Sequence, residues 1–244
     1  MWADSLTRSL THSLTHSLTR SLTHSLLACQ DGVLVTSDGI SRLAARDVLE
    51  ELYDIRVDPE EFLEFTGMGE GVFLAGVASK YGVTIDVERT KAAFFEKYLS
   101  EYCDGSVDIS FPGSAALVKA CKDRGLGVAV ASAADRVKVE GNLKAGRIDI
   151  DLFDVVVSAD AFEGKLKPNP DIFLAASAGL QVAPENCVVI EDALAGVEAA
   201  KRAGMRCVAV STTLSREKLM AGEYVPELVK AEIGEITVED LIRI

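Results

Sequence analysis

The spacing of hydrophobic positions changes along the chain. Residues 39–53 and 69–103 carry apolar side chains at helical spacing, as at Leu43, Val48 and Leu52, and are predicted to be helices. No convincing strand is predicted before about residue 126. Short apolar runs then alternate with helical stretches, and these runs are GVAVAS (127–132), FDVVVSA (153–159), CVVIED (187–192) and RCVAVS (206–211). Apolar strands separated by helices are typical of a parallel sheet covered on both faces.

Punctuating residues support this α/β pattern. Pro168 and Pro170 precede a helix predicted to begin near Asp171, and Gly204 follows the helix predicted to start near Leu194. The early helical stretch interrupts the α/β pattern. We therefore expect a core formed by residues 26–40 and 109–244, with residues 41–108 as a helical insertion.

The first 25 residues differ from the rest of the chain in composition and in their regular repeat. From Ser5 the chain repeats the units SLTR, SLTH, SLTH, SLTR and SLTH, and all three histidines (His12, His16 and His24) lie in this repeat. A period of four drifts by about 40° per repeat against an α-helix, and Ser and Thr weaken helices further. We expect residues 1–25 to be a disordered low-complexity segment. Its composition suits an organellar transit peptide, and its regularity suits a misread non-coding repeat at a wrong gene start.

Composition narrows the classes of function. The 244 residues hold 25 Lys+Arg and 38 Asp+Glu, a formal charge of −13, which disfavours nucleic acid and anionic membrane surfaces as partners. No apolar run approaches the length of a membrane span, so no integral span is predicted. The cysteines are scattered without a C-x-x-C pair, which indicates reduced thiols and a soluble protein in a reducing compartment; they are Cys29, Cys103, Cys121, Cys187 and Cys207.

Polar residues follow the predicted strands where a parallel sheet binds ligands, at the carboxyl ends. These residues are Asp31, Ser132, Asp160, Glu191 and Asp192, with Lys167 in the loop before a helix. A hydroxyl and a lysine bind phosphate oxygens, and carboxylates bind a hard cation such as Mg²⁺. The sequence therefore predicts a magnesium and phosphate site.

Each of these residues also has an ordinary structural interpretation. Asp31 precedes a glycine and suits a turn, and Ser132 suits the N-cap of a helix starting near Ala133. Lys167 suits a solvated loop, and Asp192 suits a helix cap with a solvated Glu191 beside it. Their joint occurrence at successive strand ends favours the site.

Four motifs carry a resemblance to a known family: D-G-V-L (31–34), V-A-S (130–132), K-P-N-P-D-I-F (167–173) and V-I-E-D-A-L-A-G-V-E-A-A (189–200). From about residue 26 to its end, the chain resembles the haloacid dehalogenase-like hydrolases, within their β-phosphoglucomutase-like subgroup. Three further stretches are similar to a chloroplast domain of this subgroup; they are S-A-D-A-F-E (158–163), V-A-S-A-A-D-R-V-K-V (130–139) and G-V-A-S (76–79). The resemblance implies an α/β fold with a Rossmann-like parallel sheet, an inserted helical cap and Mg²⁺. It further implies a small phosphorylated metabolite as substrate, and the chloroplast stroma or the cytoplasm as location.

The resemblance assigns a role to each candidate residue. Asp31 is the acid/base, Lys167 is catalytic, and Asp31, Glu191 and Asp192 bind metal. Phosphate or substrate binding is assigned to Ser132, Ala133, Lys167, Gly67 and Glu70.

One position departs from the family motif D-x-D-G. Here the stretch is C-Q-D-G, so Cys29 occupies the nucleophile position. A thiolate is a poor Mg²⁺ ligand, and loss of a nucleophile costs on the order of a million-fold in rate. We expect a Mg²⁺-dependent phosphatase of a small phosphate monoester that is impaired at this step. The main alternative is a non-catalytic pseudoenzyme that binds a phosphorylated ligand or a protein partner.

A second alternative is a sugar-phosphate mutase. Mutases of the subgroup carry a histidine soon after the nucleophile motif and an arginine in the cap. This chain has no histidine after His24, and its loop TGMGEG (66–71) offers Glu70 where the arginine is expected. A carboxylate there repels a second phosphate group, which favours hydrolysis. Substrate identity and oligomeric state stay open.

The strand before the motif is also altered. It retains only Leu26, Leu27 and Ala28, which arise from the tail of the repeat. Each large buried side chain lost from a core strand removes about 1.5–3 kcal/mol. We expect these residues with Cys29 to be a minimal substitute for the strand.

Overall fold

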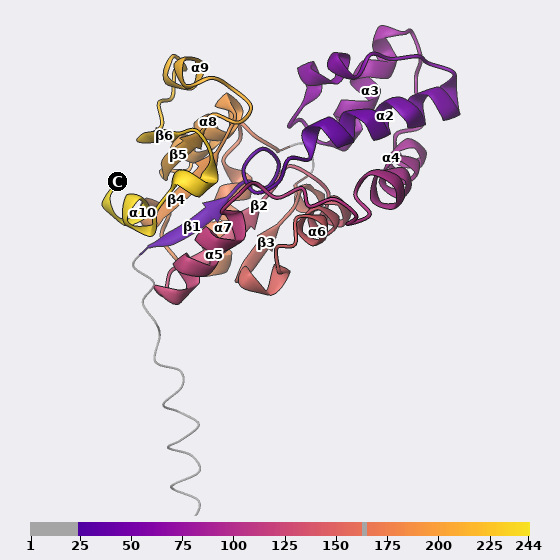
Figure 1. Ribbon diagram of the computed structural model, residues 1–244. Helices are drawn as coiled ribbons and strands as arrows, with labels where there is room; N and C mark the ends of the chain where they lie inside the picture. Colours follow the sequence, from indigo (N-terminus) through magenta and orange to yellow (C-terminus); the bar gives the residue numbers. More distant parts are fainter. Residues whose placement is uncertain (1–23, 163–164) are drawn as a thin grey trace, which may run out of the picture.

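The computed structural model describes residues 24–162 and 165–244 (Figure 1). Six parallel strands form one sheet in the order β3-β2-β1-β4-β5-β6. The strands are β1 (Ser25–Ala28), β2 (Gly127–Ala131), β3 (Val155–Val157), β4 (Cys187–Glu191), β5 (Arg206–Val210) and β6 (Leu228–Lys230). The predicted parallel α/β sheet is confirmed. Residues 1–23 of the disordered segment predicted over 1–25, with His12 and His16, lie outside the described residues, whereas Ser25 is the first residue of β1.

The central strand β1 corrects the expectation that no convincing strand precedes residue 126. Its four residues pair with β2 on one side and with β4 on the other, with Leu27 opposite both Ala129 and Val189. Leu26, Leu27 and Ala28 have no solvent exposure. The short SLLA segment is thus the central strand of the sheet, and every side chain in it is buried.

Helices cover both faces of the sheet, and side chains of each strand alternate between them. One face packs against α5 (Ser114–Asp123), α6 (Arg136–Ala145) and α10 (Val238–Arg243). The other face packs against α7 (Asp171–Leu180), α8 (Leu194–Arg202) and the short α9 (Arg216–Met220). Four short helical turns complete this part; they are η3 (Ile150–Leu152), η4 (Ala159–Ala161), η5 (Pro184–Asn186) and η6 (Ile233–Glu235).

A second group of helices lies between β1 and α5 in the chain, and Figure 1 places it beyond the carboxyl end of β1. We call these the inserted helices; they are α2 (Asp38–Tyr53), η1 (Pro59–Phe65), α3 (Glu70–Lys80), α4 (Val87–Lys97) and η2 (Tyr98–Tyr102). Their own core is aromatic, with Phe62 and Phe73 ring centroids 4.7 Å apart.

The helix predicted over residues 69–103 is wrong as a single element. The chain breaks after Lys80, where Gly82 adopts a φ of 71°. The Asp86 carboxylate then caps α4 by accepting a hydrogen bond of 3.1 Å from the Arg89 N–H. A turn glycine followed by a capping aspartate separates two helices that share one apolar pattern.

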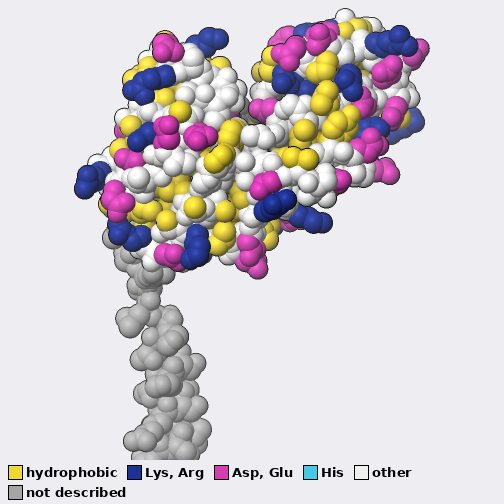
Figure 2. All heavy atoms as spheres, in the orientation of Figure 1, with side chains coloured by type: hydrophobic (Ala, Val, Ile, Leu, Met, Phe, Trp, Pro, Cys, Tyr) yellow, Lys and Arg dark blue, Asp and Glu magenta, His cyan; other side chains and the backbone are white. Residues whose placement is uncertain are grey.

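Charged side chains of both signs are interspersed on the face of the molecule that Figure 2 shows. Within the described residues, no helix has the length and apolar character needed to cross a membrane.

Candidate active site

Strand ends and inserted helices enclose one cavity of about 220 Å³. The strands contribute Cys29 and Asp31 after β1, Ser132 after β2, and Glu191 and Asp192 at the end of β4. The inserted helices close the other side with α2, α4 and the segment from Thr66 to Phe73. All nine residues predicted for the site line this cavity, namely Cys29, Asp31, Gly67, Glu70, Ser132, Ala133, Lys167, Glu191 and Asp192.

Asp160, considered at the end of its strand, is not among the residues that line this cavity. Its carboxylate accepts a hydrogen bond of 2.8 Å from the Arg136 N–H at the first residue of α6. Asp160 therefore serves as an acceptor for a free N–H at the start of α6.

Asp31 is fixed by donors from three segments. Its carboxylate accepts hydrogen bonds from Asn142 Nδ2 at 3.0 Å, from Ser132 Oγ at 3.4 Å and from the Ser37 hydroxyl. The following turn requires glycine, because Gly32 has a φ of 73° and a Cβ there would lie 2.0 Å from an Asp192 oxygen. The turn at Gly32 is thus part of the site.

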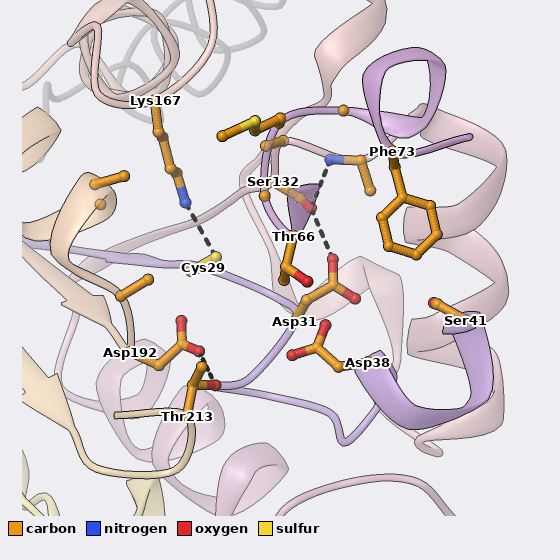
Figure 3. Close-up of a pocket in the computed structure, with 18 of the residues that line it drawn as sticks. Cys29, Asp31, Asp38, Ser41, Thr66, Phe73, Ser132, Lys167, Asp192 and Thr213 are labelled. Carbon is orange, nitrogen blue, oxygen red and sulfur yellow. Dashed lines mark hydrogen bonds between the residues drawn. The ribbon is translucent and has the colours of Figure 1, made fainter. Parts of the chain in front are cut away.

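Ser132 is buried beside Asp31 and is not a helix N-cap. Helix α6 begins at Arg136, four residues later, with Asp135 as its N-cap. The Ser132 hydroxyl instead accepts a 3.1 Å hydrogen bond from the Ala134 N–H and points toward Asp31 (Figure 3). This placement leaves the hydroxyl on the cavity wall.

Lys167 is not a solvated loop lysine. Its Nζ donates to Cys29 Sγ at 3.0 Å (Figure 3). The same Nζ forms an ion pair with the Glu191 carboxylate, which is itself buried. Glu191 also accepts hydrogen bonds from the Asp192 and Ala193 N–H groups at 2.9 and 3.2 Å. Burial opposes ionisation of Glu191, but the Lys167 ammonium and these N–H groups outweigh it, so the Glu191 pKa lies below its usual value.

The pKa values of Cys29 and Asp192 shift in the opposite direction. Burial, reinforced by the Glu191 charge, raises the pKa of the Cys29 thiol and of the Asp192 carboxyl well above their ordinary values. Asp192 accepts a hydrogen bond from the Thr213 hydroxyl on the facing loop. Asp192 does not cap α8, because the N-cap of that helix is Ala193.

Three residues offer donor atoms that could hold a metal ion in this cavity. Cys29 Sγ and one oxygen each of Glu191 and Asp192 lie within 4.8 Å of one another. The Asp31 carboxylate is not part of this group and faces Ser132 and Asn142 instead. Magnesium requires hard oxygen ligands in near-octahedral geometry, whereas the Cys29 sulfur is a soft donor. The set therefore does not fit Mg²⁺.

Lys138 is a residue of the cavity that the sequence did not identify. Its ammonium is buried 3.7 Å from Asp31 and 3.6 Å from Glu70, the first residue of α3. Burial opposes the Lys138 charge, but Asp31 and Glu70 outweigh it and raise the Lys138 pKa. Glu70 also accepts a hydrogen bond of 3.2 Å from the Asp135 N–H, so it is a paired carboxylate and not a free negative charge.

Sequence comparison decides the family. The haloacid dehalogenase-like hydrolase family matches residues 30–210, which is most of the chain. The chain belongs to the haloacid dehalogenase-like hydrolases. The resemblance stated from the motifs is thereby confirmed.

Two curated proteins show substantial identity to the chain. Protein SUPPRESSOR OF QUENCHING 1, chloroplastic, of Arabidopsis thaliana is 51% identical over 214 residues, covering 87% of this chain and 20% of that protein. The bifunctional riboflavin kinase/FMN phosphatase of the same plant is 31% identical over 74% of this chain and 46% of that protein. The chain thus spans a fifth and somewhat under half of these two relatives.

Two solved structures share the fold. CbbY from Rhodobacter sphaeroides, in complex with phosphate, has a TM-score of 0.77 at 27% identity and covers 89% of this chain and 98% of its own. β-Phosphoglucomutase from Clostridium difficile has a TM-score of 0.74 at 25% identity, with 88% and 94% covered.

Proposed function

We propose that this chain carries the phosphate-ester site of a haloacid dehalogenase-like phosphatase in which Cys29 fills the nucleophile position. The observation that carries the proposal is the convergence of Ser132, Lys167 and Asp31 on one cavity with Cys29 in its wall. Anion-binding donors and an acid/base side by side suit a phosphoryl group.

The proposed roles follow from these positions. The Ser132 hydroxyl, the Ala133 segment and the Lys167 ammonium hold phosphoryl oxygens. Asp31 gives a proton to the departing ester oxygen and later takes one from the attacking water. Asn142 and Lys138 hold the Asp31 carboxylate toward the cavity.

Cys29 limits this chemistry in the chain itself. A thiol is a weak nucleophile until it ionises, and the Cys29 pKa is raised by burial and by Glu191. The family uses Mg²⁺ here, and the sulfur does not suit that ion. We therefore propose a phosphatase that is impaired in turnover but retains phosphate binding.

The substrate class is a small phosphate monoester. The cavity of about 220 Å³ has an apolar side formed by Phe73 and Phe94. Lys138 and Glu70 offset each other's charge beside it. This environment suits an uncharged leaving group. The chloroplast is the proposed location, because SUPPRESSOR OF QUENCHING 1 is named as chloroplastic.

The deciding experiment exchanges one side chain. Cys29→Asp places a carboxylate where the nucleophile and a hard metal oxygen are both needed. We expect Mg²⁺-dependent hydrolysis of small phosphate esters to rise by about a thousand-fold or more over the parent. Released inorganic phosphate is measured across a broad ester panel.

Two controls make the gain specific. Cys29→Asn has nearly the size of Cys29→Asp without its charge, and we expect no gain from it. Lys167→Ala in the Cys29→Asp background is expected to abolish the gain, because the phosphoryl charge loses its buried cation. A folded Cys29→Asp chain without any metal-dependent hydrolysis contradicts the proposal.

A pseudoenzyme is the second candidate, and the neutral Cys29 thiol favours it. It predicts that the parent binds phosphate esters and that Cys29→Asp adds no turnover. The mutase alternative predicts isomerised sugar phosphate in place of free phosphate. Product analysis of the same Cys29→Asp reactions distinguishes all three.

A further inference from the structure

We propose that Cys29, Glu191 and Asp192 form a site for a thiophilic divalent cation of the zinc class, in preference to Mg²⁺. The inference goes beyond the proposed function, because it depends on the donor atoms alone and not on any phosphate chemistry. It follows from the disagreement between the sulfur at position 29 and the ion that the family uses.

The distances allow these donors to share one ion. Zinc binds sulfur at about 2.3 Å and carboxylate oxygen at about 2.0–2.2 Å, so tetrahedral neighbours lie about 3.5 Å apart. The three donor atoms already lie within 4.8 Å of one another. They come from two adjacent strands, β1 and β4, whose ends are held in register. Side-chain rotation over about 1 Å is therefore sufficient, without backbone movement.

A free acceptor points to a ligand between these side chains. One Asp192 oxygen accepts a hydrogen bond from Thr213, and the other is turned toward Cys29 (Figure 3). In the part of the chain that the structure describes, no hydrogen-bond donor reaches this second oxygen, although only 6% of Asp192 is exposed. Asp192 lines the cavity, so this oxygen is open to a ligand that enters from there. A cation between Asp192 and Cys29 would be its partner.

The charges also balance with one divalent ion. A cation that binds here displaces the protons of the Cys29 thiol and the Asp192 carboxyl. Cys29, Glu191 and Asp192 then carry three negative charges, and Lys167 contributes one positive charge against Cys29 and Glu191. A divalent ion neutralises the remaining two. Because one donor is sulfur, the ion is expected from the thiophilic end of the series, whereas Mg²⁺ prefers an all-oxygen set.

The test uses the full chain and metal ions alone. Cd²⁺, a zinc-class probe, is titrated while the ultraviolet charge-transfer absorption of a cadmium–thiolate bond is followed. We expect this absorption to saturate at one equivalent. Cys29→Ser is expected to abolish it, and Cys121→Ser, in α5, is expected to leave it intact. The histidines at 12, 16 and 24 give no such absorption, because they have no sulfur.

Competition with a chromophoric chelator then ranks the ions. We expect Zn²⁺ to bind the parent at least about tenfold more tightly than Cys29→Ser, and Cys29→Asp to gain affinity for Mg²⁺. Equal absorption in Cys29→Ser, or a parent that binds Mg²⁺ as tightly as Zn²⁺, overturns the inference. If Cys29→Ser fails to fold, the Zn²⁺-to-Mg²⁺ ratio of the parent alone decides. No turnover is measured here, so the phosphatase proposal stands or falls separately.

Discussion

Lys167 is the buried cation that offsets the negative charge at the strand ends of the cavity. It lies against the Cys29 sulfur, the Glu191 carboxylate and, at 4.9 Å, the ring of Phe173. Its side chain is 7% exposed and that of Glu191 is 1% exposed. A buried pair of this kind is weak evidence of net stabilisation, but removal of one partner leaves an unpaired buried charge.

We predict that Glu191→Gln lowers the free energy of unfolding by about 3–5 kcal/mol, because the Lys167 ammonium loses its anion. Urea unfolding at neutral pH measures the change. Lys167→Met added to Glu191→Gln is expected to recover part of the loss. Asp123→Asn, which breaks the exposed Lys119–Asp123 pair, serves as the surface control with little change. An equally small effect of Glu191→Gln would show that water reaches Lys167.

Sequence patterns identified the residues at strand ends but not those that hold them. Asp31, Ser132 and Glu191 follow apolar runs, and position after a strand is visible in the sequence. Lys138 and Asn142 lie within α6, where polar side chains are ordinarily solvated. They are buried because the inserted helices lie over α6. One contact between the two parts is the hydrogen bond that the Tyr98 hydroxyl donates to Asn142. Nothing in the local sequence records that contact.

Strand β1 is the element on which the sheet depends most. It has four residues, and strands pair with it on both sides. Leu26 packs into the core shared with α5 and α6, and Leu27 into the core shared with α7 and α8. The strand therefore contributes one leucine to each of the two cores.

We predict that Leu27→Ala lowers the free energy of unfolding by about 2–5 kcal/mol, because a cavity replaces a side chain that β2 and β4 enclose. Thermal and urea unfolding measure the loss. Leu63→Ala, at an η1 position that is 52% exposed, is the matched control and is expected to change stability little. A similar loss in both variants would indicate that β1 adds nothing particular to the core.

Periodicity predicted most helices and strands but failed where a break or a short strand was involved. The pattern over 69–103 is continuous, so the turn at Gly82 is visible only through its φ of 71°. Strand β6 was not predicted, because it has three residues and only Val229 is buried. Pairing with β5 determines its conformation, and such long-range pairing leaves no local pattern.

All five cysteines are free and buried across the molecule. Burial raises the pKa of Cys187 to about 11 and that of Cys121 to about 12, from an ordinary value of 9.0. The folded chain therefore holds these protons at a pH where the unfolded chain has released them. By linkage, stability from this source is complete below pH 9.0 and falls as pH rises toward 11 and 12.

We predict that the free energy of unfolding declines between pH 9 and pH 11, and that Cys187→Ala makes this decline shallower. Urea unfolding at a series of pH values measures both slopes. Disulfide reagents are expected to label Cys187 slowly in the folded chain and rapidly in urea. Identical slopes for parent and variant would contradict the buried, protonated thiol.

The two outer strands of the sheet, β3 and β6, have three residues each. An exposed strand edge is a template on which a strand from another molecule can add, and long apolar edges start aggregation. Here β3 is covered by α7, whose Gly179 lies against Val155, and β6 ends in a lysine. Three residues offer few free backbone groups to an incoming strand. The longest and most apolar strands are interior, so intermolecular sheet growth must begin with unfolding.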